Sequence, residues 1–416
     1  MSTDLKKMYK TIMDDHFTPA MEISFVDGDN RQTLFYEKVS WIIDGVQKGL
    51  RYGENPGQEA ALYRLVNGNL ALGDAKTIVP GKHLVSDIEL LQSGKHPGKT
   101  NLTDADNSLN ILRYFTDTPC AVIVKHNNPC GAARANSLEQ AYAKAYMADR
   151  VAAFGGCIAL NKAVDKATAE GIAAQYAEVV VAPEFEDGVL DILGRRKNLR
   201  VIRINAMDKL QSFIGERVVD FKSLMDGGIV AQWSFVPKTL KKEDLFIAST
   251  EYKGTTYKID REPTDQEYQD MLFGWLVESG ITSNSVIYVK DNCTVGIGTG
   301  EQDRVGVAEI AVDKAYRKLC DRYCFERYHT SFADMADEDK RAEIEADVAK
   351  QKGGLIGSSM VSDAFFPFRD GIDVGLRQGV KAVIQPGGSM NDYQSIEACN
   401  ESGASMVYTG QRSFKH

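Results

Sequence analysis

Short apolar runs rich in β-branched residues alternate along the chain with longer stretches whose apolar residues recur at helical spacing. The runs predict strands, and the stretches predict helices. The predicted strands are Cys120–Val124, Val179–Val181, Val201–Ile204, Ser285–Val289, Ala382–Ile384 and Met406–Tyr408. The predicted helices are Ser137–Arg150, Asp165–Tyr176, Asp265–Glu278, Val305–Leu319, Asp337–Lys350 and Asp392–Glu401. This alternation indicates an α/β fold, with helices packed on a largely parallel sheet.

Three loops rich in glycine and polar residues follow apolar, strand-like runs, at residues 126–131, 298–304 and 385–389. Ligands of open α/β sheets usually bind beyond the carboxyl ends of the strands. The loops are therefore candidate binding positions, although glycine-rich turns also serve as plain connectors. The loop at 298–304 lacks the ending of a P-loop and the full dinucleotide fingerprint, so it is a weak nucleotide motif.

The length of 416 residues is too great for one ordinary hydrophobic core, so two or three domains are expected. The best boundary lies near residues 205–225, where a β-branched run gives way to mixed polar sequence. No clear internal repeat is visible in the sequence. No apolar run approaches the roughly 20 residues that span a membrane, and the N-terminus lacks the apolar core of a signal peptide. We therefore expect a cytoplasmic protein without a membrane partner.

The net charge of −9 argues against nucleic acid as a partner, because phosphate backbones attract basic surfaces. A small anionic substrate remains compatible with it, provided that arginine and lysine gather in a local pocket. Arg51 and Tyr52, beside a glycine and a proline, offer a guanidinium and a phenol suited to phosphate or carboxylate. An exposed turn is the alternative interpretation.

Seven scattered cysteines give no disulfide pattern, and Cys320 and Cys324 are read as two buried small side chains rather than a metal pair. Pro129-Cys130 invites comparison with the zinc deaminases, which carry His-x-Glu followed by Pro-Cys-x-x-Cys. Here Ala133 occupies the position of the second cysteine, and no His-x-Glu occurs in the chain. We therefore expect no catalytic zinc.

Lys125 and His126 follow an apolar strand and precede a turn-rich loop. A lysine at this position could stabilise a developing oxyanion, and a histidine could relay a proton near neutral pH. Both side chains can reach one site only if the strand ends at Lys125, because successive strand residues point to opposite faces. A surface lysine and a capping histidine are the alternative. The aromatic run 365–370 is either a wall for a planar heterocycle or a core cluster.

Taken in order, these strings resemble the transformylase part of the AICAR transformylase/IMP cyclohydrolase family, from about residue 45 to the C-terminus. The matching segments are RYGENPGQ (51–58), NLTDAD (101–106), VKHNNPCGAA (124–133), AAFGGCIALN (152–161), VVVAPEFED (179–187), GGIVAQ (227–232), SNSVIYVKD (283–291), VGIGTGEQDRV (295–305), SDAFFPFRDGID (362–373), QPGGS (385–389) and TGQRSFKH (409–416).

The resemblance implies transfer of a formyl group from 10-formyltetrahydrofolate to the 5-amino group of AICAR, in the biosynthesis of IMP. It implies two cytidine-deaminase-like α/β/α lobes without zinc, at 46–215 and 216–416, after an extension of unknown role at 1–45. It also implies an obligate homodimer with active sites at the subunit interface. A non-catalytic nucleotide- or folate-binding regulator, or another one-carbon transferase on the same scaffold, is the alternative.

The resemblance also assigns residues to roles. The positions that match catalytic residues are Lys125, His126 and Asn284. Those that match residues around the nucleotide and the folate are Arg51, Tyr52, Phe154, Gly155, Arg304, Phe365, Asp370, Arg412 and His416. Some family members bind a monovalent cation, a potassium ion, where this chain has Ser283, Ser285 and Asp363. A core serine pair with a helix-capping aspartate is the alternative for these three.

The chain departs from the family pattern at three positions. Gly57 replaces the histidine of RYGENPHQ, and Ser413 and Lys415 replace histidine and arginine near the C-terminus. Only 50 residues precede the RYGENP motif, too few for the cyclohydrolase domain of the bifunctional enzymes. The expectation is a transformylase that stands alone and forms formyl-AICAR without closing the ring.

Overall fold

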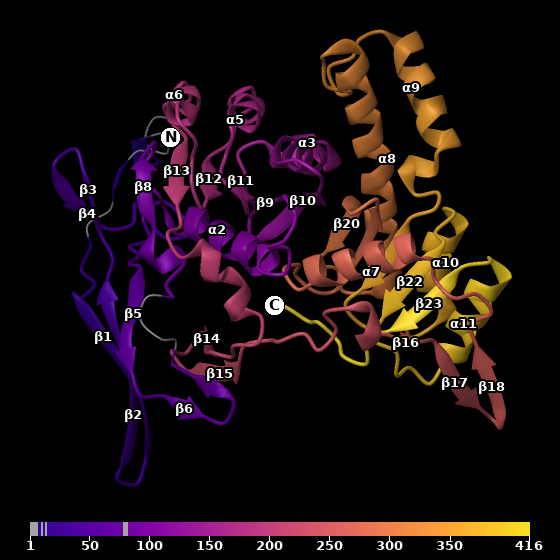
Figure 1. Ribbon diagram of the computed structural model, residues 1–416, viewed down its shortest axis with the longest axis horizontal. Helices are drawn as coiled ribbons and strands as arrows, with labels where there is room; N and C mark the ends of the chain where they lie inside the picture. Colours follow the sequence, from indigo (N-terminus) through magenta and orange to yellow (C-terminus); the bar gives the residue numbers. More distant parts are fainter. Residues whose placement is uncertain (1–6, 10, 13–14, 78–81) are drawn as a thin grey trace. The chain divides into compact units, whose positions relative to one another are not determined.

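A computed structural model describes residues 7–9, 11–12, 15–77 and 82–416. Its contacts divide the chain into two compact units. Unit 1 consists of Met1–Thr116 and Gly155–Val236, and unit 2 consists of Asp117–Phe154 and Pro237–His416. Both units mix helices with strands (Figure 1), as the alternating pattern predicts.

Unit 2 is built on a mixed sheet with the strand order β16-β23-β22-β21-β19-β20-β10-β9. Its strands are β9 (Cys120–Lys125), β10 (Asn128–Arg134), β16 (Phe246–Ile247), β19 (Ser285–Lys290), β20 (Cys293–Thr299), β21 (Ser359–Ser362), β22 (Ala382–Gln385) and β23 (Ser405–Tyr408). Strands β21, β22 and β23 run parallel, whereas β9–β10 and β19–β20 are antiparallel hairpins. The two hairpins meet where Ala133 of β10 pairs with Cys293 of β20.

The helices of unit 2 are α3 (Leu138–Ala148), α4 (Arg150–Ala153), α7 (Asp265–Glu278), α8 (Arg304–Tyr328), α9 (Glu338–Lys350), α10 (Arg369–Arg377) and α11 (Asp392–Glu401), with 3-10 turns at Lys242–Asp244 and Lys352–Gly354. A hairpin of β17 (Ser249–Tyr252) and β18 (Thr255–Lys258) packs beside α11. Helices α8 and α9 lie side by side (Figure 1) around a small apolar cluster. Cys320 and Cys324 are buried in that cluster, which confirms their interpretation as core side chains.

Unit 1 holds the parallel strands β11 (Cys157–Leu160), β12 (Val179–Ala182) and β13 (Arg200–Arg203), with β8 (Glu89–Gln92) antiparallel to β13. Its helices are α2 (Lys99–Leu112), α5 (Lys166–Ala173) and α6 (Val189–Gly194), with 3-10 turns at Val85–Asp87 and Met207–Phe213. A separate antiparallel sheet contains β1 (Ala20–Asp27), β2 (Asn30–Lys38) and β5 (Tyr63–Gly68). Three small hairpins complete the unit: β3 (Trp41–Ile43) with β4 (Val46–Lys48), β6 (Ala71–Leu72) with β7 (Ala75–Lys76), and β14 (Val219–Ser223) with β15 (Ile229–Trp233).

One order of elements occurs twice along the chain, as hairpin–helix–strand–helix–strand–helix–strand. The first copy is β9–β10–α3–β11–α5–β12–α6–β13, with the short α4 after α3. The second is β19–β20–α8–β21–α10–β22–α11–β23, with α9 after α8. A glycine lies at the same position of both second strands, Gly131 and Gly296, and each faces a helix backbone where a Cβ would clash. The structure therefore contains a repeat of secondary-structure elements that is not visible in the sequence.

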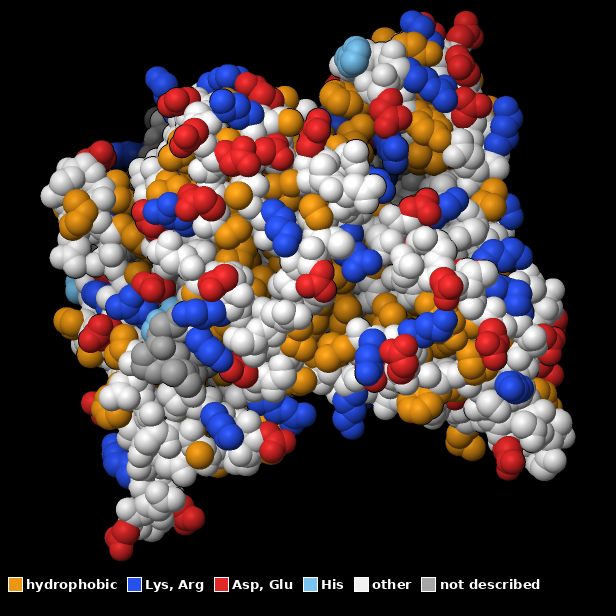
Figure 2. All heavy atoms as spheres, viewed as in Figure 1, with side chains coloured by type: hydrophobic (Ala, Val, Ile, Leu, Met, Phe, Trp, Pro, Cys, Tyr) orange, Lys and Arg blue, Asp and Glu red, His pale blue; other side chains and the backbone are white. Residues whose placement is uncertain are grey.

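The predicted strands all occur, and the predicted helices occur with shifted ends. Two predicted helices, Asp265–Glu278 and Asp392–Glu401, match at both ends. The prediction of a largely parallel sheet is wrong for the two hairpins, whose strands are antiparallel because two-residue turns connect them. Among the described residues, no helix combines the length and the apolar character needed to cross a membrane. On the face shown in Figure 2, basic and acidic side chains are interspersed.

Candidate functional site

The turn between β9 and β10 presents Lys125 and His126. Residues 120–124 of β9 are wholly buried, and the strand ends at Lys125, as a shared site for the two side chains requires. His126 and Asn127 have φ of 54° and 62°, the left-handed pair of a tight hairpin turn. The Lys125 Nζ donates a hydrogen bond of 2.8 Å to the carbonyl of Phe154, just after α4. The Lys125 ammonium is thus held in place, and the His126 side chain is exposed.

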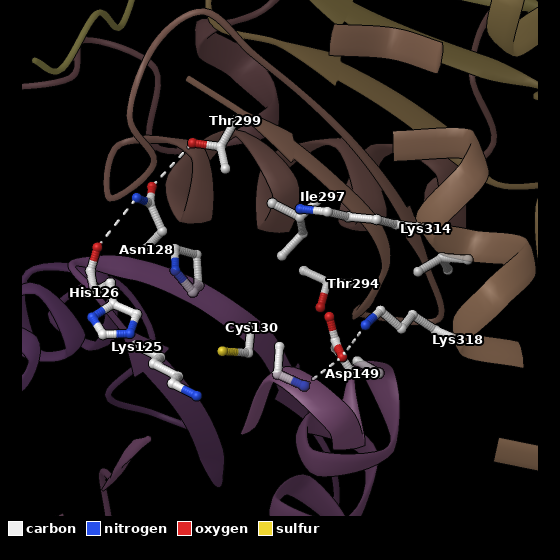
Figure 3. Close-up of a pocket in the computed structure, with 15 residues that line it drawn as sticks. Lys125, His126, Asn128, Cys130, Asp149, Thr294, Ile297, Thr299, Lys314 and Lys318 are labelled. Atoms are coloured by element: carbon white, nitrogen blue, oxygen red, sulfur yellow. Dashed lines mark hydrogen bonds and ion pairs between the residues drawn. The ribbon is translucent and has the colours of Figure 1, made fainter. Parts of the chain in front are cut away.

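A cavity of about 320 Å³ in unit 2 opens beside this turn (Figure 3). The hairpin, α4 with the residues just before it, β20 and α8 supply its walls. The lining residues are Lys125, His126, Asn128, Pro129, Cys130, Ala148, Asp149, Ala152, Thr294, Val295, Gly296, Ile297, Thr299, Lys314 and Lys318. The amide oxygen of Asn128 accepts hydrogen bonds from Thr299 Oγ1 (3.1 Å) and from the backbone of Thr282 (2.9 Å). These bonds tie the hairpin to the segment that precedes β19 and to the end of β20.

Two lysines of α8 bring positive charge to the cavity. Lys318 Nζ lies 2.6 Å from Asp149 Oδ1, and this carboxylate also accepts the backbone N–H of Ala152 as the N-cap of α4. Among the described residues, Lys314 forms no hydrogen bond or ion pair. Burial lowers the pKa of Lys314, Asp149 opposes that shift, and the neighbouring Lys318 and Arg317 add to it. Neither lysine belongs to a recognisable motif, and sequence reasoning missed both, together with Asp149.

A second group of predicted residues surrounds a buried ion pair. Arg304 contacts Asp363 through Nη1, and its Nη2 donates to Asn284 Oδ1 at 2.8 Å. Asp363 is wholly buried and accepts from the Ser283 hydroxyl and from the backbone N–H of Ser285. The five residues form one hydrogen-bonded group, in which Arg304 fixes the orientation of the Asn284 amide.

Glu278 adds a second buried carboxyl group to this cluster, which the sequence did not indicate. The Ser285 hydroxyl donates to Glu278 Oε1 at 2.6 Å. Burial raises the pKa of Glu278 well above its ordinary value of 4.5, and the nearby Asp363 raises it further. The predicted cation ligands Ser283, Ser285 and Asp363 therefore lie together, with their polar groups bonded to one another and to Glu278.

The C-terminal segment runs past the same cluster. Ser283 and Lys415 are joined by two hydrogen bonds, from Ser283 N to Lys415 O (2.9 Å) and from Lys415 N to Ser283 Oγ (3.1 Å). Lys415 Nζ reaches the carbonyl of Asn127 in the hairpin turn at 3.3 Å. Lys415, a departure from the family pattern, therefore links the chain end to the turn that carries His126.

The other predicted residues of unit 2 are more exposed. Arg412 stacks on Phe414, with its guanidinium 4.4 Å from the ring centre, and Phe414 contacts His416. Asp370 lies in the first turn of α10. The aromatic run divides between its two interpretations, because Phe366 is buried in the core and Phe365 is 41% exposed. Phe154 is also exposed.

Arg51, Tyr52 and Gly155 belong to unit 1. Arg51 is buried, its guanidinium lies 4.5 Å from the centre of the Tyr52 ring, and its Nη2 donates to the Tyr52 hydroxyl at 2.9 Å. A second buried guanidinium, Arg200, is only 1% exposed, and burial lowers its pKa to about 10 against the opposing charge of Glu178. Arg51 and Arg200 thus bring two buried guanidiniums close enough to repel one another in unit 1. Sequence reasoning missed Arg200, which reads as an ordinary strand residue.

These features define an α/β protein with a duplicated hairpin framework, a lysine–histidine turn beside a cavity in unit 2, and two buried arginines in unit 1. The sequence matches the AICARFT/IMPCHase bienzyme family over residues 11–314, and the chain belongs to this family.

Several curated relatives share the name bifunctional purine biosynthesis protein PurH. The protein of Bacillus subtilis is 35% identical over 370 residues, which cover 89% of this chain and 59% of the relative. That of Persephonella marina is 38% identical over 371 residues, with 88% and 59% covered. That of Magnetococcus marinus is 36% identical over 395 residues, with 95% and 64% covered. The chain thus spans about three-fifths of the length of these relatives.

Proposed function

We propose that this protein transfers the formyl group of 10-formyltetrahydrofolate to the 5-amino group of AICAR, a step of purine biosynthesis. Membership of the AICARFT/IMPCHase family carries the proposal, because the matched residues include the Lys125–His126 turn and every residue that lines its cavity except Lys318. The relatives named as purine biosynthesis proteins support the same pathway.

In the proposed reaction the amine nitrogen of AICAR attacks the formyl carbon, and the bond between that carbon and N10 of the folate breaks. His126 accepts the proton that the amine loses, and N10 gains a proton as it leaves. Lys125 stabilises the oxyanion of the tetrahedral intermediate. Its ammonium has three N–H donors, and one of them is committed to the carbonyl of Phe154. The remaining donors are available for the oxyanion.

Positioning matters in this reaction, because an aromatic amine conjugated to a carboxamide is a weak nucleophile. We assign Asn284 to holding the reacting groups, with its amide oriented by Arg304. Arg51, Tyr52 and Arg412 are the proposed anchors of the nucleotide. The remaining proposed substrate contacts are Phe154, Gly155, Arg304, Phe365, Asp370 and His416.

We further propose that the chain folds as two cytidine-deaminase-like lobes without zinc, at 46–215 and 216–416. The order of helices and strands that occurs twice along the chain supports this division. A cytoplasmic homodimer and a potassium ion at Ser283, Ser285 and Asp363 complete the proposal. The carboxylate and hydroxyl oxygens gathered there are of the kind that hard cations prefer.

The direct test is a purified-protein assay with AICAR and 10-formyltetrahydrofolate, with and without ATP. Formation of formyl-AICAR without ATP is expected. His126→Ala should lower kcat by about 10²- to 10⁴-fold, the usual range for a general acid or base, with a smaller change in nucleotide affinity.

The second hairpin supplies matched controls for these variants. Asp291 and Asn292 have the same left-handed turn conformation as His126 and Asn127, and Lys290 Nζ donates to the carbonyl of Ile356 as Lys125 does to that of Phe154. Asp291→Ala and Lys290→Met should therefore leave kcat nearly unchanged, whereas Lys125→Met lowers it. Normal turnover in folded His126→Ala protein would contradict the mechanism.

A further inference from the structure

The end of the cavity away from the hairpin carries charge that the proposed chemistry does not use. In Figure 3, Lys314 and Lys318 extend from α8 on one side, and Lys125 and His126 come from the hairpin on the other. Three ammonium groups and one carboxylate, Asp149, therefore line a single cavity.

The Asp149 carboxylate, the single one that lines the cavity, already has two partners. Asp149 accepts the N–H of Ala152 and pairs with Lys318 at 2.6 Å. Lys314 is half-buried and has no hydrogen bond or ion pair among the described residues. Partial burial of an unpaired charge disfavours the charged form, and the lowered pKa of Lys314 agrees with that cost. Such an arrangement is stabilised by an anion that enters the cavity.

We propose that the Lys314 ammonium, beside Lys318, binds an anionic group of a substrate, a carboxylate or a phosphate, whose reacting end lies at the Lys125–His126 turn. This inference rests on the proposed function. Pro129, Ala148 and Ile297 supply apolar wall in the same cavity, so a ligand with an apolar body fits between the two polar ends. Both proposed substrates carry a suitable anion: the folate has carboxylates on its glutamyl tail, and AICAR has a phosphate.

The proposed nucleotide anchors favour the folate as the source. Arg51, Tyr52 and Arg412 are already assigned to the nucleotide, so the folate carboxylates are the anionic groups without an assigned cation. The AICAR phosphate is the second arm of the test.

The test compares Lys314→Met, which keeps an unbranched apolar stem and removes the charge, with Lys314→Arg, which keeps the charge. Lys350→Met is the matched control, because Lys350 lies on α9 with a side chain that is 76% exposed. Dissociation constants are measured by calorimetry for AICAR, for tetrahydrofolate, for a folate analogue without the glutamyl residue, and for inorganic phosphate. Steady-state kinetics on the same proteins give kcat and KM.

Lys314→Met should weaken either tetrahydrofolate or AICAR by about tenfold to a hundredfold, as expected for the loss of a charge-assisted hydrogen bond. Lys314→Arg should retain most of the affinity, and kcat should change little in either variant. If the folate is the source, the analogue without glutamate binds both proteins equally. If the phosphate is the source, AICAR and inorganic phosphate weaken together.

Unchanged dissociation constants for all four ligands in folded Lys314→Met protein would overturn the inference, as would an equal loss in Lys350→Met. Circular dichroism and the thermal midpoint establish folding, and removal of an unpaired half-buried charge should not lower the midpoint. If the parent protein is active and Lys314→Met binds all four ligands as the parent does, the anion subsite is refuted and the proposed reaction stands. If the parent protein is inactive but ligand binding depends on Lys314, the proposed reaction is refuted and the subsite stands.

Discussion

Replacement of Glu278 by glutamine should change how the stability of the protein depends on pH. The side chain is wholly buried, and burial raises its pKa well above 4.5, with Asp363 adding to the shift. Above pH 4.5 the unfolded chain releases this proton, whereas the folded protein retains it. The folded state then binds more protons, so the free energy of unfolding falls as pH rises, by about 1.4 kcal/mol for each pH unit.

The decline continues until the pH reaches the raised pKa of the folded state, and then stops. Glu278→Gln has no proton to retain, and its amide oxygen can still accept the Ser285 hydroxyl bond that Glu278 Oε1 accepts. The stability of the variant relative to the parent should therefore increase by about 1.4 kcal/mol per pH unit from pH 5 upward. Below pH 4.5 this contribution to the difference disappears.

Urea titrations at whole pH values from 5 to 8, followed by intrinsic fluorescence, measure this difference. Glu309→Gln, on an exposed position of α8, is the control and should give a flat difference between variant and parent. A difference between Glu278→Gln and the parent that stays constant from pH 5 to 8 would refute the reasoning, because it would mean that Glu278 titrates alike in both states.

Three further tests concern the packing of β10, the Arg150–Asp321 ion pair and the proposed cation at Asp363. Gly131→Ala places a Cβ 2.1 Å from the carbonyl oxygen of Ala145 and should cost about 1–3 kcal/mol; an unchanged thermal midpoint would argue against it. Asp321→Ala leaves the largely buried Arg150 side chain without its two-pronged partner and should cost about 3–5 kcal/mol in urea unfolding. A loss below 1 kcal/mol would show that the pair is weak. If Asp363 binds potassium, turnover should be lower in tetramethylammonium chloride than in potassium chloride at equal ionic strength. Equal rates in the two salts would contradict the proposal of a bound potassium ion.

Local signals in the sequence were sufficient for much of the framework. The predicted helix Asp265–Glu278 agrees with the structure at both ends, and Thr264 and Glu267 form a capping box at its start. The strand before Lys125 was also clear, because its five residues are apolar and end at polar ones. The hairpins were missed because their turns, His126–Asn127 and Asp291–Asn292, lack the glycine that usually marks a two-residue turn.

The charged part of the cavity was beyond sequence reasoning for a different reason. Lys314, Lys318 and Asp149 come from two helical regions separated by more than a hundred residues, and each occupies a position where a solvated charge is the ordinary interpretation. Only the packing of α8 against α3 and α4 brings them together. Glu278 was similarly hidden, because a glutamate at the end of a helix gives no sign that its carboxyl group is buried.

The two hairpins cover each other's edges. Strand β10 pairs with β20 at Ala133 and Cys293, so neither strand is left as an open edge that could pair with another molecule. The two turns share a left-handed backbone conformation, but one presents His126 after Lys125 and the other presents Asp291 after Lys290. One turn geometry therefore carries two different pairs of side chains, and the side chains rather than the turn determine what chemistry is available beside the cavity.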